Sequence, residues 1–155
     1  MKKLILVLSA LALTYVSMAQ TAVSLFWKSD SLQVSEVVSE TADLYDELGH
    51  GGPAVENSHM ILRLLFNDSG AVDVYSKSGR GMARYGWYPT AEQQELERAG
   101  ADAYEVGNTI GCGGFALWDG EKEVRLVATR GRTARVGETK KGSYVEMTAY
   151  GVEYM

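Results

Sequence analysis

The 155-residue chain has little cysteine, with one residue, and little proline, with two. The single thiol, Cys112, cannot form an internal disulfide, so the fold must depend on its hydrophobic core. Long apolar runs are also scarce. The run LILVLSALALTYV near the N-terminus has 13 residues, fewer than the roughly 20 that a membrane-spanning helix needs. No second run of this kind follows, so no membrane span is expected beyond this segment.

This N-terminal segment has the three parts of a secretory signal peptide. MKK is basic, the apolar run follows, and SMA is a small-x-small ending that suits cleavage after Ala19. We therefore expect residues 1–19 to be a signal peptide and the mature protein to be periplasmic or secreted. Residues 20–155 are long enough for a single domain with a hydrophobic core.

Positively charged residues are also fewer than negatively charged ones. The chain has 15 Lys and Arg against 20 Asp and Glu, a net charge of −5, and loss of Lys2 and Lys3 with the signal peptide would make it −7. No basic stripe is present. Nucleic acid is therefore not expected as a partner, nor is electrostatic docking on anionic lipid.

Alternating hydrophobicity indicates a β-hairpin in the middle of the chain. Apolar residues recur at every second position, on one face of a strand: Met60, Leu62, Leu64 and Phe66. NDSG at 67–70 is typical of a tight turn, and AVDVYSK at 71–77 is typical of the returning strand. The predicted loop before this hairpin contains Gly49, Gly51, Gly52 and Pro53.

The rest of the chain is also strand-like. GGFALWDG, KEVRLVATR, RTARVGE and SYVEMTAYGVEY are separated by turn residues, which favours a mainly β fold, an antiparallel β-sandwich. One short surface helix is predicted near 91–98, with Thr90 as its N-cap and Gln93 as the capping-box partner. The last predicted strand continues to the end of the chain, so we expect 20–155 to be a β-rich domain truncated at its C-terminal end.

The hairpin face opposite the apolar one carries a mixed set of polar side chains, which are His59, Arg63, Asp73, Tyr75 and Lys77. Such a face is usually the solvated side of an antiparallel sheet. The alternative is a site for an acidic sugar, because histidine titrates near neutral pH and arginine binds carboxylates through two hydrogen bonds. The candidate catalytic residues are His59, Arg63, Asp73 and Lys77.

A second candidate surface is the glycine-rich aromatic segment at 78–90. Its rings could stack on sugars, or they could cap the edge of the core. With one residue of the hairpin, the predicted substrate-binding residues are Tyr75, Arg80, Tyr85, Trp87 and Tyr88.

Metal and nucleophile sites are less well supported. His50, Glu56 and His59 are suitable residue types for zinc, but a Gly-Gly-Pro loop separates the two histidines and their spacing matches no helical pair. No metal or other cofactor is therefore expected. GCGG at 111–114 lacks the ending of a phosphate-binding loop, and no base lies near Cys112 in the sequence, so a half-buried cysteine in a turn is the simpler interpretation.

Several segments, in this order, resemble one family: ENSHMILRLLFNDSGAVDVYSK, GWYPTAEQQ, VGNTIGCGGFALWDGEK and RTARV. The family is a group of secreted bacterial proteins with a domain-of-unknown-function label, associated with polysaccharide-utilisation loci. The resemblance covers roughly residues 44–154. Because members of that family are longer and largely β-sandwich, it implies that this chain is an N-terminal portion.

The resemblance also implies an activity, because an oligosaccharide dehydratase role is associated with such loci. One departure is that this chain has Gly49-His50-Gly51 where a paired histidine is expected. The leading hypothesis is thus a lyase-type loss of water from an unsaturated uronic acid end of an acidic oligosaccharide. Arg63 or Lys77 would hold the carboxylate, His59 would transfer the proton and Asp73 would orient a partner. The alternatives are a non-catalytic glycan-binding module and a structural part of a larger enzyme.

Overall fold

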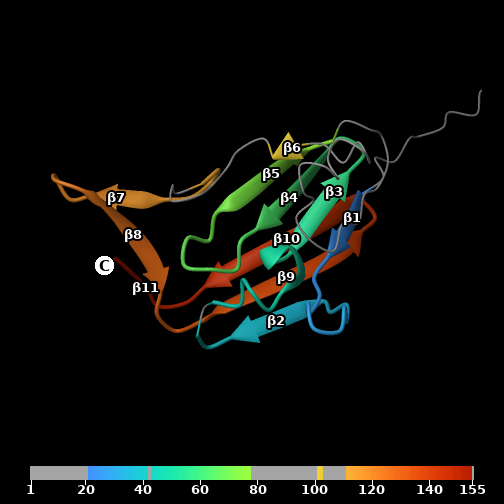
Figure 1. Ribbon diagram of the computed structural model, residues 1–155, viewed down its shortest axis with the longest axis horizontal. Coiled ribbons are helices and arrows are strands. Elements are labelled where there is room, and N and C mark those ends of the chain that lie inside the picture. The colour runs from blue at the N-terminus through green and yellow to red at the C-terminus, as the bar shows by residue number, and fades with distance from the viewer. Residues whose placement is uncertain (1–20, 42, 78–100, 103–110, 155) are drawn as a thin grey trace, which may run out of the picture.

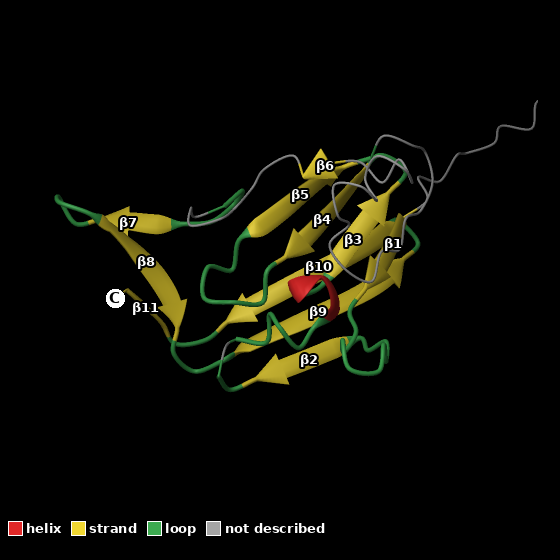
Figure 2. Cartoon of the chain, viewed as in Figure 1, coloured by secondary structure: helices red, strands yellow, loops and turns green. Residues whose placement is uncertain are grey.

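The computed structural model describes residues 21–41, 43–77, 101–102 and 111–154 (Figure 1). In this part of the chain the fold is mainly β and every strand pairing is antiparallel, as the sequence predicts (Figure 2). The predicted helix near 91–98 and the predicted signal peptide lie outside the described residues. Within the described ranges no helix combines the length and the hydropathy that crossing a membrane requires.

Three sheets make up the described part of the fold. The first has the order β1 (Thr21–Ser24), β3 (Ala54–Asn57), β4 (Met60–Leu64), β5 (Val72–Ser76), β6 (Ala101–Asp102). The second has the order β10 (Gly142–Ala149), β9 (Arg132–Thr139), β2 (Glu36–Ser39). The third has the order β11 (Val152–Tyr154), β8 (Glu123–Ala128), β7 (Ala116–Trp118). A single 3-10 turn, η1 (Gly49–Gly51), precedes β3.

The first two sheets stack as a sandwich, with β1 against β9 and β10. Their shared core is a cluster of five buried residues from the second sheet and from segments next to the first sheet: Leu25, Val37, Leu48, Phe66 and Ala134. The third sheet extends to one side of this body (Figure 1). Burial of these apolar side chains stabilises the chain without a disulfide, and Cys112 is free and exposed, not half-buried as expected.

The predicted hairpin is confirmed, as β4 and β5, with Arg63 directly opposite Asp73. In its turn, the Asn67 side-chain oxygen accepts hydrogen bonds from the backbone N–H groups of Ser69 at 3.1 Å and Gly70 at 3.3 Å. Gly70 has a φ of 55°, a conformation that glycine adopts without a steric penalty.

The burial of the hairpin differs from the expected pattern. Met60 on the predicted core face is 40% exposed, whereas Arg63 and Asp73 on the predicted outer face are only 3% and 4% exposed. Tyr75, on the same face, is 1% exposed. The physical reason is pairing: charged groups that meet partners across the strands can be buried, although isolated charges cannot. Hydrophobic alternation alone therefore does not identify the buried face.

The C-terminal segment was expected to be one strand and is two. β10 ends at Ala149 and belongs to the second sheet, whereas β11 begins at Val152 and pairs with β8 in the third. Gly151 between them has a φ of 60° and its carbonyl accepts a hydrogen bond from the Thr129 amide at 3.1 Å. This glycine allows the chain to change sheets, and the change brings the third sheet beside the hairpin turn.

Candidate functional site

A pocket of about 510 Å³ opens on the face of the first sheet that carries Arg63 and Asp73. Ligand pockets typically have volumes of about 300–1,000 Å³, so this one can hold a small ligand. Its walls come from β1, β3, β4, the segment after β1, η1 and β9. The lining residues are Ala22, Val23, Ser24, Phe26, Ser31, Gln33, His50, Ala54, Glu56, Ile61 and Glu138.

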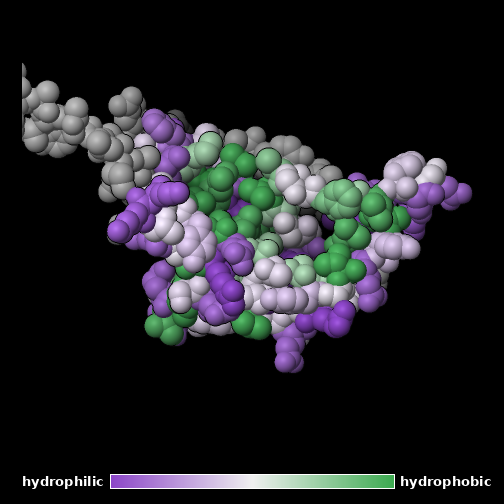
Figure 3. Space-filling model, turned by 180° about the vertical axis from the view of Figure 1, so that it is seen from behind, coloured by the Kyte–Doolittle hydropathy of each residue, from purple (hydrophilic) through white to green (hydrophobic). Residues whose placement is uncertain are grey.

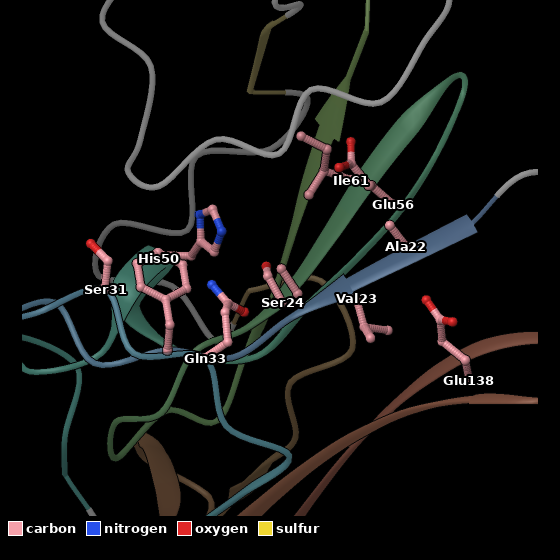
Figure 4. Close-up of a pocket in the computed structure, with 11 residues that line it drawn as sticks. Ala22, Val23, Ser24, Ser31, Gln33, His50, Glu56, Ile61 and Glu138 are labelled. Carbon is pink, nitrogen blue, oxygen red and sulfur yellow. The ribbon is translucent and has the colours of Figure 1, made fainter.

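Strand register explains why these residues meet. Ala22 lies opposite Glu56, and Glu56 lies opposite Ile61, so one row of neighbouring strands contributes three lining residues. Figure 4 shows His50 at one end of the pocket and Glu56 with Ile61 at the other, with Ser24 and Gln33 between them. Glu138 approaches from β9, on the other side of β1. The pocket therefore holds one imidazole and two carboxylates.

The main chain places His50 in the pocket. Its φ of 61° is unusual for a residue with a side chain, and Gly51 and Gly52 after it also have positive φ values of 71° and 152°. The Gly51 carbonyl accepts a hydrogen bond from the Phe66 amide at 2.8 Å, which attaches η1 to the residues after β4. The His50 ring packs edge-on against Phe26, with ring centres 5.3 Å apart and an interplanar angle of 83°.

Two buried ion pairs lie in the same sheet beside the pocket. The guanidinium of Arg63 donates a hydrogen bond to the carboxylate of Asp73, and the ammonium of Lys77 donates one to Glu56. Lys77 also donates to the backbone carbonyl of Asn57 at 2.7 Å, and the Arg63 guanidinium lies 5.2 Å from the centre of the Tyr75 ring. Each charge is thus compensated, which burial requires.

These charges act on His50. The pKa of His50 is lowered from its ordinary value of 6.5 to about 4, mainly because the side chain is buried and in part because of the Arg63 charge, whereas the Glu56 carboxylate opposes this change. The imidazole is therefore neutral at physiological pH, with one nitrogen able to accept a proton and the other able to donate one. A neutral imidazole and a carboxylate that line the same pocket, at its two ends, form an arrangement that supports acid–base chemistry.

The four candidate catalytic residues are not all brought together. Arg63, Asp73 and Lys77 lie in the buried ion pairs, and Tyr75 packs against Arg63. His59 lies in the exposed turn between β3 and β4, where its amide donates a hydrogen bond to Asn57 Oδ1 at 2.8 Å, and it is not among the pocket residues. The remaining predicted substrate-binding residues lie outside the described residues, and these are Arg80, Tyr85, Trp87 and Tyr88.

His50 is the pocket residue that the sequence-based assignment left out. It was weighed only as a zinc ligand, because its Gly-Gly-Pro surroundings indicate a loop. The useful signal was the Gly-His-Gly-Gly pattern, since glycines allow a histidine to be pressed against a neighbouring strand. In the described part of the chain, no group of three or more His, Cys, Asp or Glu side chains is arranged to hold a metal ion.

Comparison with known proteins places the chain in a family. A family model described as a domain of unknown function, DUF4861, matches residues 9–153. No curated protein and no solved structure matches the chain. The family match covers well over half of the 155 residues and agrees with the resemblance to a domain-of-unknown-function family. The chain therefore belongs to the DUF4861 family.

Proposed function

We propose that the chain is an exported protein of a polysaccharide-degrading system and that it acts on acidic oligosaccharides. The reaction is an elimination, the loss of water from an unsaturated uronic acid end. One observation carries the proposal: neutral His50 and Glu56 line a pocket of about 510 Å³ beside two buried ion pairs. This arrangement supplies a base, a carboxylate and fixed positive charge in one place.

In the proposed reaction, the His50 imidazole removes a proton from the carbon next to the conjugated double bond of the unsaturated unit. The electron pair of that C–H bond forms a new carbon–carbon double bond to the neighbouring carbon. The hydroxyl of that neighbouring carbon leaves as water, with the proton that the His50 imidazolium returns to it. Arg63 and Lys77 lie beside the pocket in ion pairs with Asp73 and Glu56, and the positive ends of these pairs would stabilise part of the negative charge that develops on the substrate. Arg63 acts at a distance, as its effect on the pKa of His50 illustrates.

The role of His50 replaces the sequence-based assignment of proton transfer to His59. His50 lines the pocket together with Glu56, whereas His59 is exposed in a turn. An anionic substrate beside His50 would raise the pKa of the imidazole towards neutrality, because a nearby negative charge favours the protonated form. Substrate binding would thus prepare the base for proton transfer.

Mass spectrometry after incubation with saturated and unsaturated uronic acid oligosaccharides tests this proposal. We expect an unsaturated substrate to lose one water in the presence of the wild-type chain. His50→Gln should reduce turnover by at least about 100-fold, since general bases contribute roughly 10²–10⁴-fold. His59→Gln is the matched control and should retain turnover. Full activity in His50→Gln with loss of activity in His59→Gln would support the sequence-based assignment instead.

A second candidate function is glycan binding without chemistry. The observation in its favour is a set of exposed aromatic side chains in and next to the third sheet, with Phe115 66% exposed and Trp118 and Tyr154 each 69% exposed. Aromatic rings with free faces can stack on sugars. This candidate predicts binding of oligosaccharides with no change of mass in any of them. Loss of water from a single substrate would exclude it as the whole function.

A further inference from the structure

A second pocket lies between the third sheet and the hairpin turn, away from His50. Its volume is about 230 Å³. Figure 3 shows the surface from behind, hollowed between the main body and the third sheet, with hydrophobic residues on both sides. The residues that line the pocket are Asp68, Ser69, Gly70, Gly113, Gly114, Phe115, Leu126, Ala128, Arg132, Met147, Ala149 and Val152.

Arg132 is the cationic residue among those that line this pocket. It begins β9 and is 3% exposed. Within the described part of the chain, its Nε and Nη1 atoms have no hydrogen-bond partner, and the guanidinium forms no ion pair. A Cβ atom at Gly70 would lie 3.9 Å from Arg132 Nη2, so a side chain at that position would narrow the space beside the guanidinium. The turn glycine therefore keeps this space open.

The protein compensates the charge of Arg132 only in part. The guanidinium lies 5.9 Å from the centre of the Phe66 ring, at cation–π distance. Burial lowers the pKa of Arg132, and the carboxylates of Asp68 and Asp43 oppose this effect without forming an ion pair. Both aspartates are exposed and thus keep contact with solvent. A buried guanidinium that lacks partners is costly, and a bound anion removes that cost.

The opposite wall of the pocket is apolar. In the third sheet Leu117 lies opposite Val124, Tyr154 opposite Leu126 and Val152 opposite Ala128, so that one face of three strands carries these side chains. Phe115 directly precedes β7, which begins at Ala116. Phe115, Leu126 and Val152 line the pocket. An apolar wall facing a buried cation suits a ligand with a flat nonpolar surface and an anionic group.

We propose that this pocket binds one acidic unit of an oligosaccharide, with its carboxylate or sulfate ester on Arg132 and its ring on the wall formed by Phe115. The claim that an anionic group binds at Arg132 depends only on the burial of this guanidinium. The saccharide part rests on the proposed function, and it makes the pocket a subsite that holds a substrate unit distant from the reacting end. Arginine is suited to this role because its N–H groups match the geometry of a carboxylate.

Isothermal titration calorimetry tests the proposal with three probes: tetragalacturonate, its carboxyl-reduced neutral counterpart, and inorganic sulfate. We expect tetragalacturonate to bind more tightly than either of the others. Arg132→Met should weaken its binding by about 10–100-fold, the loss expected for a hydrogen bond to a charged group. Arg135→Met is the matched control on the same strand, because Arg135 is exposed and paired with Glu36. It should bind as the wild type does.

Two further variants keep the test informative if Arg132→Met does not fold. Asp68 and Phe115 are exposed, so their replacement leaves the core intact. Asp68→Asn removes a carboxylate that competes for the guanidinium and should tighten binding of tetragalacturonate by about two- to fivefold. Phe115→Ala should weaken tetragalacturonate binding and leave sulfate binding unchanged. No change in either variant would overturn the proposal.

The outcomes separate this inference from the proposed function. Binding that depends on Arg132 without any loss of water would support the subsite and count against the dehydratase. Turnover that depends on His50, with equal affinity for all three probes, would support the dehydratase and count against the subsite. Equal binding of tetragalacturonate and sulfate would overturn the saccharide part, and wild-type affinity in Arg132→Met would overturn the whole inference.

Discussion

His50 combines two features that a merely structural loop residue rarely has. Its φ of 61° lies in a region where residues other than glycine carry a conformational cost of about 1–3 kcal/mol. Its pKa is held at about 4, mainly by burial. The backbone conformation costs stability, and the hydrogen bond from Phe66 to Gly51 at 2.8 Å is one of the contacts that compensate for it. Features of this kind gather at functional sites.

The pKa of His50 leads to a stability prediction. Protonation of the folded state is disfavoured, because the folded pKa of about 4 lies below the ordinary value of 6.5. The free energy of unfolding should therefore be highest above pH 6.5 and should fall as the pH drops from 6.5 towards 4. The full difference would be about 3 kcal/mol, at 1.36 kcal/mol per pKa unit. His50→Gln should be less sensitive to pH in this range.

Urea unfolding at pH 7, 6 and 5 measures this effect. The interval from pH 7 to 5 is the most informative one, because carboxylates begin to take up protons at lower pH. His59→Gln is the control, since His59 is exposed, and it should show the same pH dependence as the wild type. An equal fall in stability in the His50 variant and the wild type would contradict the assigned pKa.

The buried pair of Arg63 and Asp73 gives a second prediction at this scale. Asp73→Asn removes one charge and leaves the other buried, which typically costs about 3–5 kcal/mol. The double variant Arg63→Met with Asp73→Leu should recover most of that loss, since it leaves no unmatched charge. Chemical denaturation of the wild type, both single variants and the double variant measures the coupling. Additive losses in the double variant would show that the pair does not act as a unit.

The sequence predicted part of the candidate site, for reasons that concern single residues. It placed Arg63 and Asp73 on one face of a hairpin, because strand alternation fixes which side chains share a face. It could not predict that this face is buried, since burial depends on ion pairing across strands. Nor could it place His50, whose approach to Glu56 depends on a loop conformation with three successive positive φ values.

At the scale of elements, the loop at η1 and the C-terminal end of β4 determine where His50 lies. The Pro53 carbonyl accepts a hydrogen bond from the Leu64 amide at 2.9 Å, and the Gly51 carbonyl accepts one from the Phe66 amide. Between them, Gly52 is pressed so closely on β4 that a Cβ atom there would lie 2.0 Å from the Leu64 carbonyl oxygen. Only a glycine at position 52 permits this close contact with β4, and the contact brings the His50 imidazole over the first sheet.

Gly52→Ala should therefore be severely destabilising. The new methyl group would meet main chain that belongs to a strand and cannot move aside, and the φ of 152° adds conformational strain. Gly120→Ala is the matched control, because Gly120 has a φ of 106° and nothing lies within 4 Å of its Cβ position among the described residues. In thermal unfolding, we expect the free energy of unfolding to fall by about 3 kcal/mol more in Gly52→Ala than in the control. Equal losses of stability in the two variants would mean that the positive φ, and not the contact with Leu64, causes the destabilisation.

Strands were predicted better than their connections. The hairpin and the strands after residue 115 follow from alternating hydrophobicity and from turn residues such as those at 67–70. The break between β10 and β11 was missed because Tyr150 and Gly151 do not interrupt the alternation. The sequence pattern does not predict that β10 and β11 belong to different sheets. This change of sheet depends on hydrogen bonds from Thr129 and Tyr150 to distant parts of the chain.

At the scale of the whole molecule, the third sheet is small and incompletely covered. Its outer strands, β7 and β11, each pair on one side only within the described residues. Its apolar face is exposed at Val152 beside the second pocket, to 47%, and at two residues that do not line that pocket, to 40% at Leu117 and 69% at Tyr154. Adjacent exposed apolar side chains next to unpaired strand edges favour association with another surface.

This face should make the chain self-associate as its concentration rises. Sedimentation velocity should give a sedimentation coefficient that increases with concentration for the wild type, and the double variant Leu117→Lys with Tyr154→Lys should remain a monomer. Charges on this face oppose its burial against a second copy, because each would lose its hydration. Val38→Lys is the control, since Val38 is 66% exposed on β2, at the edge of the second sheet, and should associate as the wild type does. A wild-type chain that stays monomeric at every concentration would show that exposure of this face does not drive association.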